Sequence, residues 1–345
     1  MNQQIKKFMK GMLATIFPPY RKLLDANRLL QDRLDSFQTK YPPGHYYSPV
    51  LTAEEVERRK TFIYRNVSLE NQIDLNHSKQ MELLREFASY LPDFPYSAKS
   101  QELMYSLDNG WFENSDGYIL FCFLKKFRPK KVIEIGSGHS SALMLDAQKP
   151  LFGGNLELTF IDPNPDDRLS QFISRSDNSQ NAKVIRREVQ EVEVDFFKAL
   201  DENDILFIDS SHVAKAGSDL NYILFDILPV LRPGVIIHFH DIFYPFEYPE
   251  FWLTKLFKGF GWNEVYMLRA FLAHNDRYEV LFFNDYLEKS EESFYKKRLP
   301  VCLKRNDANN CGQSLWLRRL AQNPAGLSLS DRKAATDADP ATMRL

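Results

Sequence analysis

The sequence predicts an α/β protein with a doubly wound, mostly parallel sheet, preceded by a helical N-terminal extension. Two observations lead to this class. Short apolar segments alternate with helical stretches from about residue 131 onward, which is typical of βαβ units and a parallel sheet. Before that point, apolar residues recur at helical spacing instead.

The extension begins with two amphipathic helices. In residues 1–17, apolar side chains recur at helical spacing with lysines between them, and a double proline ends the pattern. A more polar helix follows, in which Leu23, Leu30 and Phe37 lie one heptad apart. Two heptads are too few to indicate a coiled coil.

Apolar periodicity and turn signals place the remaining elements. Helices are expected over 76–91, 116–127, 141–148, 219–228 and 263–273, with Asp116 as the N-cap of the second. Parallel strands are expected over 132–135, 156–161, 182–185, 205–208 and 235–239. Two further strands fit the antiparallel edge that many such sheets carry, over 278–283 and 314–317.

These elements divide the chain into four parts. We expect amphipathic helices over 1–40, a helical cap or extension over 41–115, and the sheet-containing core over 116–320. Residues 321–345 are polar and Ala-rich without periodicity, which predicts a disordered tail.

Composition narrows the expected partners and compartment. The formal net charge of -2 gives no reason to expect a nucleic-acid partner. Only three cysteines occur, without metal-ligand spacing, so we expect neither a disulfide scaffold nor a zinc site, and a cytoplasmic location. No apolar run reaches the length of a membrane span. For residues 1–17, peripheral membrane contact and packing against the domain or a partner helix both stay open, as does an oligomer.

A glycine turn follows the first predicted strand. Gly136-Ser137-Gly138 leads directly into a helix, where glycines permit close backbone approach to a ligand and the helix N-terminus offers free N–H groups. A plain strand-to-helix turn would read the same way. Asp162 closes the second strand, where a carboxylate can accept hydrogen bonds from ribose hydroxyls. The full Gly-x-Gly-x-x-Gly pattern of dinucleotide sites is absent, because Ser141 occupies its last position.

The segment Glu134-Ile135-Gly136-Ser137-Gly138 resembles the first motif of class I S-adenosylmethionine-dependent methyltransferases, an acidic residue followed by Gly-x-Gly. The Leu-Arg-Pro-Gly turn ending at Gly234 is similar to another turn of that family. The resemblance covers about residues 116–283 and implies a Rossmann-like fold. It also implies that the first segment surrounds the methionine part of the cofactor and that Asp162 holds the ribose.

Acidic residues also follow the fourth and fifth strands, at Asp209 and Asp241. Their surroundings resemble bacterial small-molecule and sugar O-methyltransferases, in which acids at these places often bind magnesium. The two strands are neighbours in that fold, about 5 Å apart. The carboxylates are therefore expected to bracket Mg²⁺ or another divalent cation, or to orient the acceptor without one. Catechol-type enzymes place Asn after the second acid, whereas Ile242 stands here.

Two histidines are candidates for the proton acceptor. His212, three residues beyond Asp209, is the favoured base, because imidazole ordinarily titrates near neutral pH. His240 is the alternative, as base, metal ligand or partner of Asp241. His238 shares a strand face with His240 but lies deeper, which indicates a structural role.

Together these features predict an S-adenosylmethionine-dependent methyltransferase acting on the oxygen of a small polar metabolite or sugar hydroxyl. Two alternatives stay open. One is a nicotinamide-dependent oxidoreductase, which a spectral change with the reduced cofactor would reveal. The other is a non-catalytic binding or scaffold protein with a methyltransferase-like fold, which would bind the cofactor without turnover.

Overall fold

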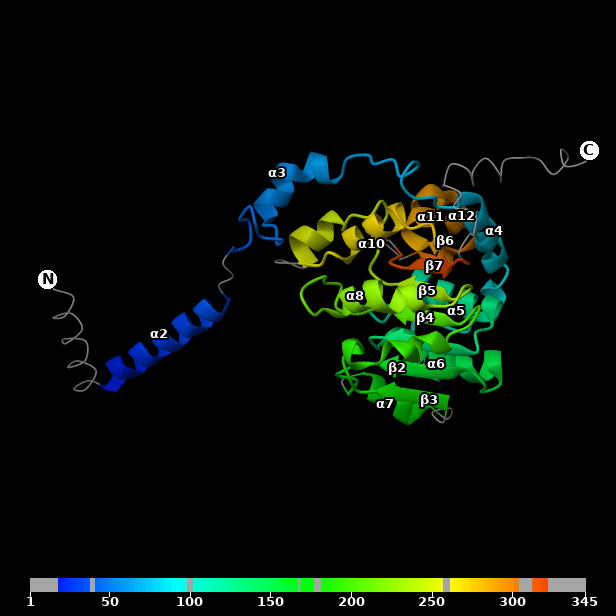
Figure 1. The fold of residues 1–345 in the computed structure, drawn as a ribbon, viewed down its shortest axis with the longest axis horizontal. Coiled ribbons are helices and arrows are strands. Elements are labelled where there is room, and N and C mark those ends of the chain that lie inside the picture. Colours follow the sequence, from blue (N-terminus) through cyan, green and yellow to red (C-terminus); the bar gives the residue numbers. More distant parts are fainter. Residues whose placement is uncertain are drawn as a thin grey trace, which may run out of the picture. The chain divides into compact units, whose positions relative to one another are not determined.

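The computed structural model describes residues 18–37, 41–97, 102–166, 168–176, 181–256, 261–303 and 312–321. The chain divides into two compact units, one formed by residues 1–60 and 252–261 and the other by residues 61–251 and 262–345 (Figure 1). The helix predicted within residues 1–17 and the tail predicted beyond residue 321 lie outside the described residues.

The smaller unit contains α2 (Pro18–Phe37), most of α3 (Ala53–Ile63) and the π-helical segment η6 (Trp252–Leu256). The α2 helix is the second one that the sequence predicts, and all its described side chains are exposed. A capping box begins α3: Glu55 N donates to Thr52 Oγ1 (3.3 Å), and Thr52 N donates to Glu55 Oε2 (3.5 Å). This pair satisfies two N–H groups that a helix start otherwise leaves unpaired.

The larger unit is built on a seven-stranded sheet of order β3-β2-β1-β4-β5-β7-β6. Strands β1 to β5 are parallel, and β7 runs antiparallel to both β5 and β6. Their bounds match the predicted segments to within two residues: β1 Lys131–Ile135, β2 Glu157–Ile161, β3 Ala182–Ile185, β4 Ile205–Ile208, β5 Ile236–Phe239, β6 Tyr278–Phe283 and β7 Leu315–Arg319. The predicted doubly wound, mostly parallel sheet is confirmed.

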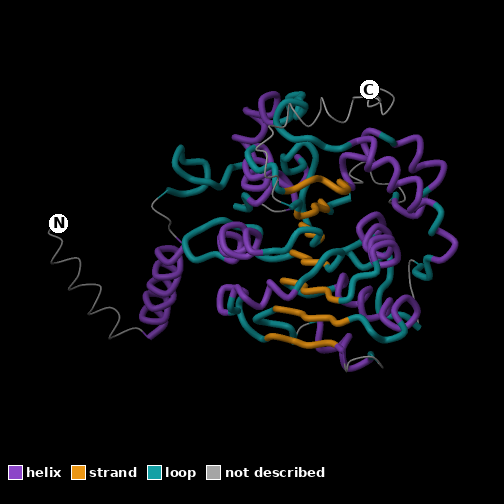
Figure 2. Tube along the Cα trace, turned by 45° about the vertical axis from the view of Figure 1, so that its right-hand side comes forward, coloured by secondary structure: helices purple, strands orange, loops and turns teal. Residues whose placement is uncertain are grey.

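Helices lie on either side of the column of strands (Figure 2). The α-helices are α4 His77–Ala88, α5 Asn114–Phe127, α6 His139–Phe152, α7 Leu169–Arg175, α8 Asp219–Tyr222, α9 Leu228–Val230, α10 Glu264–Ala273, α11 Asn284–Ser290 and α12 Glu292–Arg298. Shorter turns are η1 Leu91–Asp93, η3 Val189–Glu191, η4 Val194–Ala199, η5 Ile223–Ile227 and η7 Pro300–Cys302. Among the described residues, no helix is both long and apolar enough to cross a membrane.

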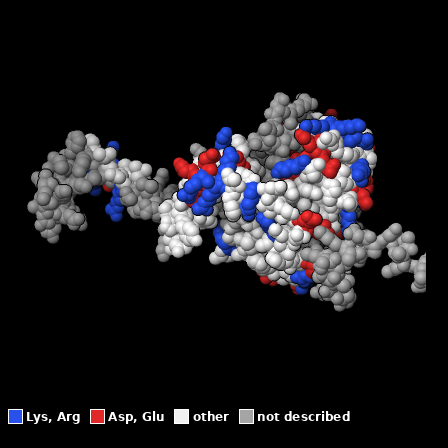
Figure 3. All heavy atoms as spheres, turned by 90° about the horizontal axis from the view of Figure 1, so that it is seen from above, with Lys and Arg blue, Asp and Glu red and all other residues white. Residues whose placement is uncertain are grey.

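The core lies between the sheet and these helices. All four residues of β4 and of β5 are buried, as expected for strands covered on both faces. Aromatic stacking joins α5 to the sheet, because the rings of Phe123 and Trp316 lie 3.9 Å apart. Cys122 is also fully buried in α5, as a small apolar residue. On the face that Figure 3 shows, the coloured basic and acidic side chains are interspersed.

The helix predicted over 141–148 is longer at both ends, as α6 (His139–Phe152), and two other helices differ from their predictions in kind. Asp116 is not the N-cap of α5, because the helix begins at Asn114 and Asp116 lies buried in its first turn. Its carboxylate accepts a hydrogen bond from Gln313 N (2.9 Å) instead of capping its own helix. The helix predicted over 219–228 is interrupted by the π-helical segment η5, just before Pro229. A proline there cannot donate to the turn before it, and a π-helical turn accommodates that loss.

Candidate active site

The carboxyl ends of the parallel strands bring the predicted site residues together. The strand register pairs Ile135 with both Ile161 and Ile208, and Ile208 with Phe239. The residues after these strands therefore lie along one edge of the sheet, where open α/β sheets bind ligands.

Backbone geometry explains the first glycine of the turn. Gly136 has φ +85, and a Cβ there would lie 1.8 Å from the carbonyl oxygen of Asp209. Gly138 differs, because its backbone is extended and a Cβ would meet only the Arg168 side chain at 3.8 Å. Only Gly136 is therefore required for close approach between β1 and β4.

Glu134 stabilises the turn from behind. Its carboxylate is fully buried and accepts hydrogen bonds from the Ser140 and Ser141 hydroxyls, the latter at 2.5 Å. Ser141 Oγ in turn accepts from Gly138 N (3.0 Å). Burial raises the pKa of Glu134 to about 8, although the two serine hydrogen bonds oppose the shift.

A cavity of about 460 Å³ opens in front of the turn. Its size lies within the usual range for small-molecule sites. Asp162 lines it, and its carboxylate accepts hydrogen bonds from Ser137 Oγ and from Asn164 N, the latter at 2.7 Å. Most of the remaining lining follows β1, β3 and β4: Gly136, Ser137, Glu188, Val189, Gln190, Asp209, Ser210, Ser211, Lys215, Gly217, Ser218 and Asp219. Glu134 and Gly138, predicted here, do not line the cavity.

A cluster of carboxylates and imidazoles adjoins the cavity through Asp209. One ligand atom each from Asp209, His240 and Asp241 lies within 4.8 Å of the others. His240 Nδ1 is 3.6 Å from Asp209 Oδ1 and 3.4 Å from Asp241 Oδ1. His212 Nε2 approaches the same pair, at 3.4 Å from Asp209 Oδ1 and 3.4 Å from Asp241 Oδ2. The four residues predicted at the ends of β4 and β5 are thus brought together.

Two members of this cluster have a strained backbone conformation. His212 (φ 59) and Asp241 (φ 60) both adopt the left-handed region. Residues other than glycine persist in that region only where the surroundings enforce it, often at functional sites. For His212 the surroundings are the start of α10, because Asn263 N and Glu264 N both donate to its carbonyl, at 3.1 and 3.2 Å.

Glu264 also pairs with the His212 ring. His212 Nδ1 lies 2.7 Å from Glu264 Oε2, and the Trp262 ring packs 4.1 Å from the imidazole. Burial alone would lower the pKa of His212, but hydrogen bonding to Asp209 and Glu264 raises it to about 10. His212 is therefore an imidazolium at neutral pH as long as no other positive charge compensates the carboxylates of this cluster.

The pKa values of His240 and Asp209 are shifted by the same neighbours. Burial opposes the charge of His240, but Asp241 and Asp209 raise its pKa well above the usual range. Burial likewise opposes the charge of Asp209, whose pKa is nevertheless lowered by His240 and His212. Two carboxylates sharing two imidazoles in a buried place form a strongly coupled electrostatic unit.

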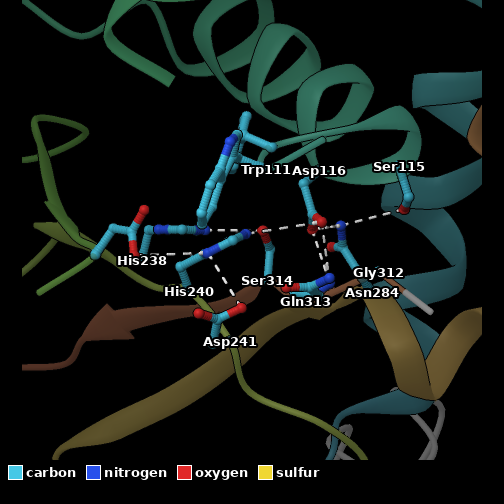
Figure 4. A network of polar contacts seen from close by, with 12 residues as sticks. Trp111, Ser115, Asp116, His238, His240, Asp241, Asn284, Gly312, Gln313 and Ser314 are labelled. Carbon is cyan, nitrogen blue, oxygen red and sulfur yellow. Dashed lines mark hydrogen bonds and ion pairs between the residues drawn. The ribbon is translucent and has the colours of Figure 1, made fainter. Parts of the chain in front are cut away.

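His238 lies behind this cluster, as predicted from its depth in β5 (Figure 4). Its Nε2 lies 2.8 Å from Ser314 Oγ, and its ring stacks on Phe207 at 3.7 Å. Burial lowers the pKa of His238 well below the usual range, so the ring is neutral. This environment is that of a structural histidine.

Several residues at the site were not predicted. The segment Glu188–Gln190 follows β3 and could have been found by the same rule that singled out residues after the other strands. Glu264 and the buried Asp116 approach the two histidines from α10 and α5, and nothing in their local sequence indicates those contacts.

Comparisons with known proteins identify a domain that contains this site. Residues 133–242 match the family model described as a methyltransferase domain. A protein of Archaeoglobus fulgidus, described as uncharacterized, is 37% identical over 171 residues, covering 48% of this chain and 76% of the relative. The methyltransferase domain includes the glycine turn, Asp162 and the charged cluster. This match therefore argues against the nicotinamide oxidoreductase alternative.

Solved structures with similar folds include two methyltransferases. The SAH-bound methyltransferase of Podospora anserina is 16% identical, with a TM-score of 0.40, covering 78% of this chain and 96% of its own. The O-methyltransferase TomG of Streptomyces achromogenes, in complex with SAM, is 13% identical, with a TM-score of 0.39, covering 77% of this chain and 96% of its own. From the family-model match, the chain contains a methyltransferase domain, which spans residues 133–242.

Proposed function

We propose that this methyltransferase acts on a hydroxyl oxygen of a small polar metabolite or sugar, at a site where Asp209, His240 and Asp241 hold a divalent cation. One observation carries the proposal: Asp209 both lines the cavity and belongs to the carboxylate–imidazole cluster. An acceptor held at the cluster would therefore lie beside a cofactor held in the cavity, as methyl transfer requires.

For the cofactor, we assign the cavity lining around the glycine turn. The backbone at Gly136 and Ser137 would adjoin its methionine part, and Asp162 would accept hydrogen bonds from the ribose hydroxyls. Glu134 and Gly138 serve this site indirectly, because both belong to the hydrogen-bonded chain behind the turn. Glu188 and Gln190, which also line the cavity, would contact the end of the cofactor opposite its methionine part.

The donor set of the cluster fits a divalent cation. Two carboxylates and one imidazole present ligand atoms within 4.8 Å of one another, and His240 turns Nδ1 toward both carboxylates. Carboxylate oxygens suit Mg²⁺ and Mn²⁺, and an imidazole nitrogen is readily accepted by Mn²⁺ and other transition metals. Such a cation, when bound, lowers the pKa of an acceptor hydroxyl and orients it.

The transfer itself forms one oxygen–carbon bond and breaks the sulfur–carbon bond of the cofactor, and the acceptor loses its proton. We assign that proton to His212. Glu264 binds Nδ1 and leaves Nε2 directed at Asp209 and Asp241, where the acceptor would lie. Because His212 is an imidazolium beside uncompensated carboxylates, it can accept a proton only when other positive charge occupies the cluster.

A titration and an acceptor screen test the proposal. Calorimetry should show S-adenosylmethionine binding to the wild type, and Mn²⁺ binding that Asp209→Asn abolishes. The exposed Asp226 provides a matched control, since Asp226→Asn should leave both affinities unchanged. Demethylated cofactor should form with hydroxylated acceptors and stop in excess chelator. Full turnover in excess chelator would show that the reaction needs no cation. A methyl group found on nitrogen or carbon would overturn O-methylation.

A further inference from the structure

Asp116 connects the charged cluster to a second layer of buried polar groups. It lies in the first turn of α5 and is 3% exposed. Its Oδ2 is 3.9 Å from His240 Nε2, which makes it the acid on the far side of that ring from Asp209 and Asp241. Figure 4 shows Asp116 between His240 and the pair formed by Asn284 and Gln313.

The two nitrogens of His240 have different surroundings. Nδ1 faces Asp209 and Asp241, whereas Nε2 is buried without a hydrogen-bond partner among the described residues. A histidine that binds a metal through one nitrogen carries its proton on the other, and that N–H is almost always donated to an acceptor. At Nε2 of His240, the acid in reach is Asp116.

We propose that Asp116 is a positioning residue for His240, accepting the Nε2 proton so that the Nδ1 lone pair points at the cation. The inference rests on the proposed function, since it assigns a role toward the cation held by Asp209, His240 and Asp241. An approach of about 1 Å from the present separation would bring Asp116 and His240 into hydrogen-bond range.

The position of the Asp116 carboxylate is itself strongly restrained. Gln313 N donates to both oxygens, at 2.9 and 3.1 Å, and Asn284 Nδ2 donates to Oδ1 at 3.0 Å. Asn284 is restrained in turn, because its backbone N donates to Ser314 O and its Nδ2 also reaches Ser115 Oγ. An acceptor restrained by donors from two segments can orient an imidazole, which a flexible surface carboxylate cannot.

A purely structural role would predict different behaviour. In that case Asp116 would only join α5 to the segment before β7 through Gln313 N and to α11 through Asn284 Nδ2. Asp116→Asn keeps the shape and one acceptor oxygen for that bond but removes the charge facing His240. Asp146 offers a matched control, because it also accepts two backbone N–H groups, from Met104 (3.1 Å) and Tyr105 (2.8 Å), but belongs to α6 and has no contact with the cluster.

The test measures Mn²⁺ affinity by calorimetry and the His240 ring by NMR of ¹⁵N-histidine-labelled protein with Mg²⁺, for which only seven histidines need assignment. Asp116→Asn should weaken Mn²⁺ binding by about 10–100-fold. Asp146→Asn should change it by less than about twofold, as expected of a carboxylate with no partner near the metal. The His240 Nε2–H signal should be strongly downfield in the wild type and shift upfield in Asp116→Asn. Unchanged affinity and an unchanged signal would overturn the inference.

Two further outcomes remain decisive. If Asp116→Asn does not fold, the wild-type spectrum decides, because a His240 that carries its proton on Nδ1 instead of Nε2 overturns the inference. If the wild type binds no cation, the proposed function is wrong about the cation. The Nε2–H signal then tests the contact between Asp116 and His240 by itself. If Asp116→Asn leaves this signal unchanged, the contact is refuted. If the signal is lost in Asp116→Asn, Asp116 is the residue that orients His240.

Discussion

The two sides of the site are built by different means. The glycine side, formed by Gly136–Gly138 and Asp162, gets its shape from the backbone. There, the left-handed Gly136 lets β1 lie against Asp209, and the Asp162 carboxylate is held by a hydroxyl and an N–H group. The charged side, formed by Asp209, His212, His240 and Asp241, consists of ionisable groups that are largely buried and face one another.

This difference teaches which physical effect controls each side. On the glycine side the main risk is a clash, because a single added carbon atom has no space at Gly136. On the charged side the main risk is an uncompensated buried charge, which costs several kcal/mol when its partner is removed. Substitutions of similar size should therefore act through sterics on one side and through electrostatics on the other.

The largest effect is expected on the charged side. His212→Ala should lower turnover by about 10²–10⁴-fold, the usual contribution of a positioned base. The affinity for S-adenosylmethionine should stay nearly unchanged, because His212 does not line the cavity. Steady-state kinetics and calorimetry measure both quantities, with the exposed His274→Ala as control. Near-wild-type turnover in His212→Ala, together with loss in His240→Ala, would transfer the role to His240.

The next prediction compares the loss of stability on substituting two glycines of the glycine side. Gly136→Ala should destabilise the protein by about 2–4 kcal/mol, from the clash with Asp209 and a strained φ. Gly138→Ala should cost less than about 1 kcal/mol, because its backbone is extended and its Cβ would be unobstructed. Urea unfolding measures both values. Equal losses would show that the turn does not depend on close approach at Gly136.

A smaller effect concerns cofactor affinity. Asp162→Asn should weaken S-adenosylmethionine binding by about tenfold, since an amide retains the shape but loses charge-assisted hydrogen bonds. Asp166→Asn is the matched control, because Asp166 is an exposed acid of the same loop, paired with Arg186 at 2.7 Å. Calorimetric titration distinguishes them. Equal affinity in Asp162→Asn and the wild type would remove Asp162 from the cofactor site.

The last prediction concerns the pH dependence of stability. Glu134 has a folded pKa of about 8, raised by burial above the 4.5 of an ordinary glutamate. A raised folded pKa means that the folded protein binds more protons, so wild-type stability is lost as pH rises from 4.5 through about 8. Glu134→Gln should therefore match the wild type at about pH 4 within about 1 kcal/mol and lose less stability by pH 9. Parallel pH slopes in urea unfolding would contradict a protonated Glu134.

Secondary structure and the site's location were largely predictable from the sequence. All seven strands follow from apolar segments, because buried strands need such residues and the turns between them need glycine and proline. Residues that follow the strands were identifiable for the same reason, since parallel strands end along one edge. The break at η5 was not predicted, because the pattern of residues 219–228 fits a continuous helix.

The sequence by itself thus determined the α/β class, the glycine turn and the gathering of Asp209, His212, His240 and Asp241, because these depend on local periodicity and on strand order. Only the tertiary structure decided how the charges are paired. Asp116 meets Asn284 and Gln313, which are 168 and 197 positions away, and Glu264 meets His212 across 52 positions. Such contacts leave no local pattern, since they depend on how α5, α10, α11 and the segment before β7 pack together. That packing also sets two pKa values: burial raises that of Glu134, and the carboxylates brought beside His212 raise that of its imidazole against the effect of burial.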